Sequence, residues 1–438
     1  MHLPTIKPMH QAIIRCLRFP GCFGLAWACI AWVAFGSEPQ DDSLGIIRVS
    51  SGSSERVYVP FSVPLKGLVL PTGSNLELWE VNAPGSLPLP CQIDGASPPQ
   101  LWSVLRGATP TGTNRVFEVH QTSSTDRQQV RIRDDSRSFT VLDGDRPVLT
   151  YNYSTVDPPP GTSDRYRRSG FIHPVWSPSG NPLTEIHPAD HIHHLGLWAP
   201  WTRTEFDGHE IDFWNLKQGE GTVRFARLLK KWEGPVFGGF QVLQEHVWLK
   251  APEGERVVLN EILTVRVWNL GETDRPQWLL DRISTYRAAT DQPLQLKAYR
   301  YGGLGFRATA LWHNGNSDYL TSELKTRKDG DATRARWCDV YGETPGGIEG
   351  IVFMSHSSNR AHPEPVRIWP ADSNGGRGDV FFNFCPVRET DWTLTPGKDH
   401  VLRYRLHGHT GRLSPTACEQ LWRDFTEPPS ATFTRAIP

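Results

Sequence analysis

The sequence predicts an all-β protein, in which a large antiparallel β-sandwich follows a small β-sandwich domain and precedes one short helix. The 438 residues include 17 Trp, 39 Gly and 36 Pro, a composition typical of short strands joined by shaped turns. Several segments alternate polar and apolar residues, which is the strand period, and a convincing helical stripe occurs only near the end. Because a chain of this length exceeds one ordinary core, we expect two domains.

Residues 1–36 have the pattern of a secretion signal. Arg15 and Arg18 contribute to a basic start, residues 22–35 are almost wholly apolar, and small residues precede Ser37. The apolar run is too short for a comfortable membrane span. We therefore expect export to a periplasm or beyond, and no integral membrane segment in the processed protein.

The charge balance disfavours nucleic acid as a partner, and the cysteines leave both disulfides and buried thiols open. Lys and Arg number 46 against 47 Asp and Glu, a net charge of -1 without a long basic run, so nucleic acid is not an expected partner. Four cysteines lie beyond the signal, widely separated and without a CxxC motif: Cys91, Cys338, Cys385 and Cys418. Their spacing predicts neither a metal site nor a disulfide pairing.

The first domain is predicted over residues 44–122. Strand-like segments with turn-forming residues between them occur at 46–49, 57–59, 76–80 and 115–119. The region offers few candidates for catalysis, so an accessory or sheltering role is the expectation.

The larger domain is predicted over residues 128–412. Strands at 139–142 and 148–153 flank the turn sequence Asp-Gly-Asp-Arg at 143–146. Long alternating strands follow at 240–249 and 256–268, joined across Ala-Pro-Glu-Gly, and another at 277–286. Such strands bury one face, while the other lines a groove or meets solvent.

Residues 413–438 hold the predicted helix and a tail. Ser414 suits the helix cap and Pro415 its first turn. Cys418, Leu421, Trp422 and Phe425 form an apolar stripe that predicts a docking surface.

Residues 187–198 carry the strongest chemical signal, because four histidines and Asp190 fall within eight positions. If residues 190–194 are extended, His191 and His193 share one face, while Asp190 and His194 share the other.

Three interpretations of this cluster remain open. In a metal site, His191 and His193 would be ligands to zinc, iron or copper, with a carboxylate or third histidine from elsewhere. In a metal-free site, one histidine would be the general acid or base, and Asp190 or Asp212 would fix its tautomer. In the third interpretation the histidines only cap neighbouring strands.

Other loops add candidates. Residues 165–168 are basic and lead toward the cluster, which would suit a uronate or a sulfated sugar. Residues 299–307 have glycines that let the backbone approach a ligand, and Arg307 could bind an anion or a carbonyl group. Polar and stacking groups on later loops include Trp337, Asp339 and Asn359.

These motifs resemble a known family. The segments Pro-Val-Trp-Ser-Pro-Ser-Gly at 174–180, Pro-Ala-Asp-His-Ile-His-His-Leu-Gly at 188–196 and Asp-Phe-Trp at 212–214 are similar to the PmoA-like family, exported bacterial proteins often labelled methane oxygenase. The resemblance covers about residues 128–412 and implies export. The strand order and the closing segment Pro-Gly-Lys-Asp-His-Val-Leu-Arg-Tyr-Arg-Leu-His at 396–407 are similar to the galactose mutarotase-like supersandwich, a fold of carbohydrate epimerases, lyases and hydrolases.

We therefore predict an exported carbohydrate-active protein, a lyase, hydrolase or epimerase that uses acid-base chemistry. We expect the larger sandwich to bind the carbohydrate in a cleft lined by the histidine motif, Trp198, Trp214 and Arg307. His193 or His194 would move the proton, Asp190 or Asp212 would orient it, and Arg307 or a divalent metal would stabilise negative charge. The catalytic candidates are Asp190, His191, His193, His194, Asp212 and Arg307. The substrate-binding candidates are Trp198, Trp214, Asn215, Trp337, Asp339 and Asn359. The alternatives are a non-catalytic glycan-binding protein and a metal-dependent oxidoreductase, as the family label suggests.

Overall fold

The computed structural model describes residues 43–436, apart from 69, 71–73, 84, 96–97 and 124–128. In this part of the chain the fold is all-β with one α-helix, which confirms the predicted fold class. The predicted secretion signal lies outside the described residues.

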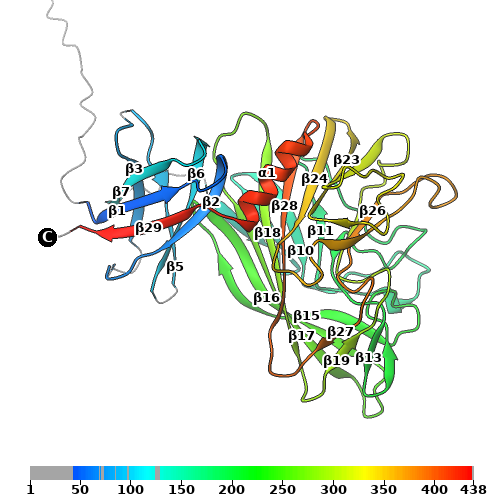
Figure 1. Cartoon of the computed structure of the whole chain (residues 1–438). Coiled ribbons are helices and arrows are strands. Elements are labelled where there is room, and N and C mark those ends of the chain that lie inside the picture. Colours follow the sequence, from blue (N-terminus) through cyan, green and yellow to red (C-terminus); the bar gives the residue numbers. More distant parts are fainter. Residues whose placement is uncertain are drawn as a thin grey trace, which may run out of the picture. The chain divides into compact units, whose positions relative to one another are not determined.

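The amino-terminal strands form two small sheets that share one apolar core. The first sheet has the order β29-β1-β7-β3-β4 and the second the order β2-β6-β5. The last strand pairs with β1 along its whole length, from Gly45 opposite Arg435 to Ser50 opposite Ser430, so the end of the chain completes the sheet (Figure 1). The strands are β1 Gly45–Ser50, β2 Arg56–Pro64, β3 Asn75–Glu80, β4 Leu89–Pro90, β5 Gln92–Asp94, β6 Gln100–Thr109, β7 Asn114–Thr122 and β29 Ser430–Arg435. The four strands predicted here are confirmed.

A nine-stranded and an eight-stranded antiparallel sheet make up the larger sandwich. Their orders are β22-β25-β26-β20-β12-β11-β10-β9-β8 and β15-β16-β17-β18-β28-β24-β23-β21. Buried apolar residues from both sheets, among them Tyr151, Phe306 and Val265, belong to one core cluster.

The bounds of these strands follow. In the nine-stranded sheet they are β8 Val130–Asp134, β9 Ser138–Asp143, β10 Arg146–Asn152, β11 Phe171–Val175, β12 Leu197–Trp198, β20 Leu304–Arg307, β22 Arg334–Ala335, β25 Glu364–Ile368 and β26 Phe381–Phe384. In the eight-stranded sheet they are β15 Gly221–Trp232, β16 Phe237–Trp248, β17 Arg256–Trp268, β18 Gln277–Ala288, β21 Ser317–Thr321, β23 Trp337–Thr344, β24 Gly347–Ser355 and β28 His400–Thr410. A four-stranded sheet contains β13 Thr204–Phe206, β14 His209–Ile211, β19 Leu294–Leu296 and β27 Trp392–Leu394.

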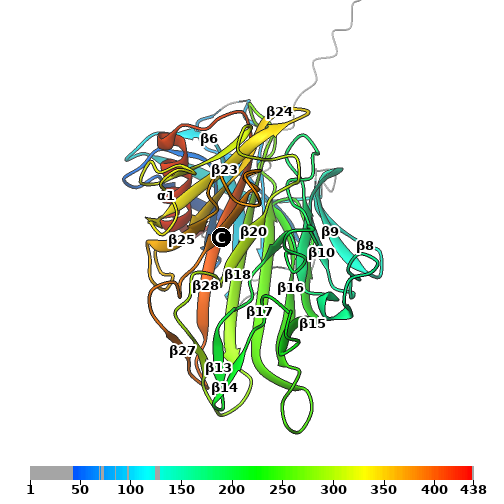
Figure 2. The ribbon, with the colours of Figure 1, turned by 90° about the vertical axis from the view of Figure 1, so that its right-hand side faces the viewer.

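Long strands dominate the eight-stranded sheet, and Figure 2 shows β16, β17, β18 and β28 running beside one another. Strands β16 and β17 pair from Phe237 opposite Trp268 to Trp248 opposite Arg256. The hairpin predicted across residues 251–254 is therefore confirmed. Burial alternates along β17, so one set of side chains packs into the sandwich, as the alternating sequence predicts.

Helix α1 spans Pro415–Thr426 and begins as predicted. The Ser414 hydroxyl accepts a hydrogen bond from the backbone N–H of Ala417, and Pro415 occupies the first turn. Cys418 belongs to a buried cluster with Trp337 and Met354, and Leu421 and Trp422 pack against it. The predicted apolar stripe thus docks the helix on β23 and β24. Among the described residues, no helix has the length and apolar character needed to span a membrane.

Candidate functional site

The histidine segment is a looped hairpin rather than an extended strand. Its neck is held by the bridge between Ile186 and Leu195. The backbone N–H of His187 donates to the carbonyl of His194 at 2.9 Å, and two tight turns fill the tip. Gly196 follows with φ +70, and a Cβ there would lie 2.6 Å from the carbonyl oxygen of Ile172, so only glycine fits.

The turns gather side chains that a strand would separate. The ring centroids of His191, His193 and His194 lie 4.7 to 5.6 Å apart. The alternation expected for an extended segment is therefore absent, and all three imidazoles share one site. Trp369, from the end of β25, contacts the group, with its ring 4.7 Å from that of His191.

Asp190 and His191 form a hydrogen-bonded pair. The Nδ1 of His191 donates to Oδ2 of Asp190 at 2.9 Å, because a carboxylate can only accept. This bond fixes the tautomer and leaves Nε2 as the basic atom. The His191 side chain is 39% exposed, so it can exchange a proton with a bound molecule.

Arg307, at the end of β20, holds the Asp190 side of this pair in place through hydrogen bonds. Its guanidinium donates two hydrogen bonds of 2.9 Å to the two oxygens of Asp190 and a third of 2.9 Å to Asp379. Burial raises the pKa of Asp190, but the bonds from His191 and Arg307 outweigh burial and hold that pKa well below its ordinary value. Asp190 therefore stays ionised and keeps His191 oriented.

Two carboxylates of this network were not predicted as site residues. Asp379 lies just before β26, and Glu185 lies at the neck of the hairpin with Oε2 3.6 Å from Nε of Arg307. Burial raises the pKa of Glu185, and Arg307 only partly offsets it. The sequence did contain a signal for Glu185, because this carboxylate precedes His187 of the histidine segment by two residues. Asp379 is distant in sequence and could be placed only by the fold.

Arg307 is not free to stabilise negative charge on a substrate, which corrects the role predicted for it. Its side chain is 2% exposed, and three carboxylates already surround it. We assign it instead to positioning Asp190.

His194 and His193 also differ from their predicted proton-moving role. His194 is buried against Trp198 and Phe381, so it cannot reach a ligand in this conformation. Burial is the largest cause that lowers the pKa of His193 to about 3 and the pKa of His194 well below its ordinary value. Both rings are therefore neutral near pH 7, and His191 remains the histidine suited to proton transfer.

The predicted sugar-stacking tryptophans are core residues. Trp198 and Trp214 are both buried, with ring centroids 5.0 Å apart. They form an aromatic cluster with Phe171, Trp369 and Phe381, on which the histidine hairpin rests. The sequence could not distinguish this use of tryptophan from a ligand platform, because both demand a large flat ring.

Asp212 builds a turn rather than orienting a histidine, and Asn215, which was predicted to bind substrate, donates to Asp212 within the same turn. Oδ1 of Asp212 accepts from the backbone N–H groups of Trp214 and Asn215 at 2.8 and 2.9 Å, and Oδ2 accepts from the Asn215 side chain at 2.6 Å. Both carboxylate oxygens are thus occupied. The role predicted for Asp212 is corrected to holding Trp214 in place.

The remaining predicted binding residues lie in other buried networks. Trp337 donates to Glu419 of α1 at 2.8 Å, and Asp339 accepts from His409 at 2.9 Å. The Asn359 side-chain amide donates to the backbone carbonyl of Arg403 at 2.8 Å. These partners tie strands and helix together, and we correct the substrate-binding role predicted for Trp337, Asp339 and Asn359 to packing.

The described residues place no third side chain where it could join His191 and His193 as a metal ligand. The described part of the chain contains no group of three or more His, Cys, Asp or Glu side chains placed to hold a metal ion. A divalent metal therefore stays a prediction, and the site can be described without one.

The sandwich interior holds a second titratable cluster that was not predicted. Glu261 accepts from Ser284 at 2.5 Å, from Arg282 at 3.2 Å and from Nε2 of His246 at 3.3 Å. Burial raises the pKa of Glu261, but the partners outweigh it, so the pKa is lowered overall. These residues are all buried, and they cross-link β16, β17 and β18.

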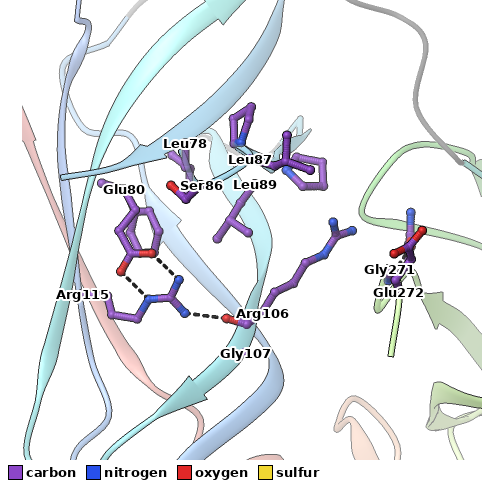
Figure 3. A pocket seen from close by; sticks show the side chains of 14 residues that line it. Leu78, Glu80, Ser86, Leu87, Leu89, Arg106, Gly107, Arg115, Gly271 and Glu272 are labelled. Carbon is purple, nitrogen blue, oxygen red and sulfur yellow. Dashed lines mark hydrogen bonds and ion pairs between the residues drawn. The ribbon is translucent and has the colours of Figure 1, made fainter. Parts of the chain in front are cut away.

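A cavity of about 680 Å³ lies away from both clusters. Figure 3 shows its wall of Leu78, Leu87 and Leu89, with the ion pair of Arg115 and Glu80 beside it. The sequence predicted a cleft lined by the histidine motif and tryptophans. Trp198 and Trp214 are buried, so they do not line an open cleft in this conformation, and the histidine site lies on a hairpin.

The comparisons with known proteins give a family but no activity. A family model described as a family of unknown function (DUF6807) matches residues 138–423. No curated protein sequence matches the chain. Similar solved structures include the heparan sulfate lyase HepC from Pedobacter heparinus and a mutant of it, each with 8% identity and a TM-score of 0.31, covering 67% of this chain. The matches span 38% of those chains, and a TM-score of this size does not establish a common fold.

Proposed function

We propose that this chain, which belongs to the family of unknown function DUF6807, is an acid-base enzyme of carbohydrate substrates in which His191 moves the proton. One observation carries the proposal. His191 alone of the three clustered histidines combines a carboxylate partner, Asp190 at 2.9 Å, with a substantially exposed ring. A general base needs both an oriented ring and access to the substrate.

Acid-base chemistry also needs a group that donates a proton, and Glu185 suits this role. Its carboxyl is 27% exposed and shares the Arg307 side chain with Asp190. Burial raises the pKa of Glu185 while the network lowers that of Asp190, so the pKa values of the two carboxyls are pushed apart. We assign Glu185 as the proton donor and Asp190 as the positioning residue for His191.

Carbohydrate is the substrate class that these groups suit. Sugar hydroxyls both donate and accept hydrogen bonds, and the site offers both kinds of partner. Glu185 and His191 provide acceptors, while the exposed Arg377, which pairs with Asp379, provides donors. The buried tryptophans do not support a purely stacking glycan-binding surface.

The test is a substrate screen followed by matched variants. Neutral and acidic oligosaccharides are incubated with the protein, and reducing-end release, unsaturated products and epimers are measured. We expect His191→Gln to lower kcat by about 10²- to 10⁴-fold. His209→Gln, at an exposed position on β14, serves as the control and should keep full turnover. Full turnover by His191→Gln would refute the proposal.

A second measurement needs no substrate. Nitrogen NMR of the imidazoles should show His191 as the Nδ1–H tautomer in the wild type. Asp190→Asn should weaken that preference, because an amide oxygen is a poorer acceptor than a carboxylate. A wild-type His191 that is mainly the Nε2–H tautomer would show that the pair does not form.

A further inference from the structure

Two guanidinium groups lie over the ring of Tyr301, close to the histidine hairpin. The Cζ atoms of Arg300 and Arg367 are 5.5 and 5.3 Å from the ring centroid. Arg300 is exposed, and Tyr301 and Arg367 are half-buried, so this group of side chains meets solvent. Arg300 and Tyr301 belong to residues 299–307, the segment whose glycines were predicted to let the backbone approach a ligand.

One carboxylate, that of Asp331, holds two arginines in this region. Its Oδ2 lies 2.7 Å from Nη1 of Arg367, and its Oδ1 accepts from Nη1 of Arg388 at 3.3 Å. Arg300 lies over Tyr301, and no hydrogen bond or ion pair joins its side chain to another residue in the described part of the chain. We call Arg300, Arg367, Arg388 and Asp331 the arginine cluster. These four residues carry three positive charges and one negative charge.

The indole of Trp369 connects this region with the histidine hairpin. Its Nε1 donates to the hydroxyl of Tyr301 at 3.1 Å, and its ring centroid lies 4.7 Å from that of His191. Trp369 is 4% exposed, so it acts as a spacer between two accessible groups and not as a ligand platform. Because Tyr301 and His191 contact the same indole, an oligosaccharide is long enough to reach both.

The hairpin and the arginine cluster differ in charge. At the hairpin, three carboxylates meet two arginines, an excess of one negative charge: Glu185, Asp190 and Asp379 with Arg307 and Arg377. The arginine cluster has an excess of two positive charges. An anionic group is therefore attracted to the cluster and repelled by the hairpin carboxylates. This difference orients an acidic oligosaccharide, with its anionic group at the cluster and a less charged part at His191.

We propose that the arginine cluster is an anion subsite, which binds the carboxylate or sulfate group of an acidic oligosaccharide while a neighbouring sugar lies at His191. The placement of that neighbouring sugar rests on the proposed function. Arg300 makes the direct contact, because its guanidinium is exposed and its parallel N–H groups match two oxygens of a carboxylate or sulfate. Arg367 and Arg388 add positive charge, and Asp331 holds them in position.

Calorimetry with three matched trimers tests the proposal. The full chain is titrated with galactotriose, with trigalacturonate and with sulfated galactotriose, all at the same ionic strength. We expect both acidic trimers to bind with a Kd at least about 10-fold lower than that of the neutral trimer. Added salt should weaken the binding of the acidic trimers only, because it screens exposed charges.

Arg300→Gln isolates the direct contact. It should weaken the binding of the acidic trimers by about 10-fold and leave that of the neutral trimer unchanged. Arg300→Lys keeps the charge without the two-pronged edge and should bind with intermediate affinity. The control is Arg131→Gln on β8, at the other end of the nine-stranded sheet from β25, which removes an equally exposed charge and should keep wild-type binding.

Three results would overturn the anion subsite. The first is equal affinity for the neutral and acidic trimers, and the second is wild-type binding of the acidic trimers by Arg300→Gln. The third is an equal loss in Arg131→Gln and Arg300→Gln, because this would mean that the acidic trimers respond to the net charge of the protein and not to one site.

The outcome is separable from that of the proposed function. His191→Gln should bind the acidic trimers with the wild-type Kd while losing turnover, whereas Arg300→Gln should raise KM for an acidic substrate more than it lowers kcat. If His191→Gln keeps full turnover and Arg300→Gln loses acidic binding, the assignment of His191 fails and the anion subsite stands. The converse result removes the anion subsite and leaves the acid-base proposal.

Discussion

Among the histidine–carboxylate pairs of the described residues, the one on the hairpin and the one formed by His246 and Glu261 inside the sandwich differ in access. His191 donates to Asp190 at 2.9 Å, and its side chain is 39% exposed. His246 donates to Glu261 at 3.3 Å, and its side chain is 0% exposed. The pairs have the same chemistry, so solvent access separates a candidate catalytic group from a cross-link.

The surroundings of the two carboxylates reinforce this difference. Glu261 is bonded by His246, Arg282 and Ser284, which lie on adjacent strands, so the network joins parts of one sheet. Asp190 is bonded by Arg307 from the sheet and by His191 from the hairpin, so it joins a rigid element to an exposed ring. We infer that the inner pair stabilises the fold and that the outer pair presents a reactive group.

The largest effect should come from the inner pair. Glu261→Gln leaves Arg282 charged and buried without its carboxylate partner. We expect the free energy of unfolding to fall by about 3–5 kcal/mol, as measured by urea denaturation. A loss below about 1 kcal/mol would contradict the cross-linking role.

The control for this variant lies on the neighbouring strand. Glu245 pairs with Arg224 near the surface, where the Arg224 side chain is 44% exposed. Glu245→Gln makes the same chemical change outside the core. It should cost about 0–1 kcal/mol, because exposed ion pairs contribute little.

Asp190→Asn should have an intermediate effect on stability. Arg307 retains Asp379, and the asparagine oxygen can still accept one hydrogen bond, so we expect a loss of about 1.5–3 kcal/mol at pH 7. Because the folded-state pKa of Asp190 is depressed, its carboxylate stabilises the fold above about pH 4 and loses that contribution as the pH falls further.

Denaturation at two pH values measures this effect. The difference between the wild type and Asp190→Asn should shrink toward pH 3. A difference that stays constant from pH 7 to pH 3 would show that ionisation of Asp190 is not its source.

The sequence predicted the sheets well because their signal is local. Alternating residues at 256–268 and the turn residues at 251–254 require no knowledge of the rest of the chain, and β17 and its hairpin occur where predicted. The Ser414 cap and Pro415 define the start of α1 in the same way. These features depend on neighbours within a few residues.

The site was predicted only in part, because its contacts are distant in sequence. Asp190, His191 and Arg307 were recognised as candidates, but their roles depend on contacts such as that between Arg307 and Asp379, 72 residues apart. Trp198 and Trp214 show a second limit of prediction from sequence. A tryptophan that lines a cleft and one that supports a hairpin look alike in sequence, and only burial distinguishes them.

Acid should weaken the fold through histidines whose pKa is lowered by burial. Burial lowers the pKa of His193 to about 3, whereas an unfolded histidine titrates near 6.5. As the pH falls from about 6.5 to about 3, the unfolded chain takes up the proton first, so the folded state loses stability over this window.

His193→Gln should remove this contribution and flatten the acid limb of the stability curve. We expect the wild type to lose about 1–3 kcal/mol more than the variant between pH 7 and pH 4. His173 and His407, whose pKa values burial lowers to about 4 and about 3, leave a residual slope in the variant. His209→Gln is the control and should follow the wild-type curve. Superimposable curves for His193→Gln and the wild type would place His193 in contact with water.

The smallest effect on stability should come from His191. Its ring is substantially exposed, and removing it leaves the bonds between Arg307 and both Asp190 and Asp379 in place. His191→Gln should therefore change the free energy of unfolding by no more than about 0.5 kcal/mol. The same substitution is expected to cost most of the turnover, so activity and stability separate at this residue, whereas Glu261→Gln is expected to change stability. A stability loss of about 2 kcal/mol or more would mean that the hairpin depends on His191 for its structure, and the contrast between the two pairs would then fail.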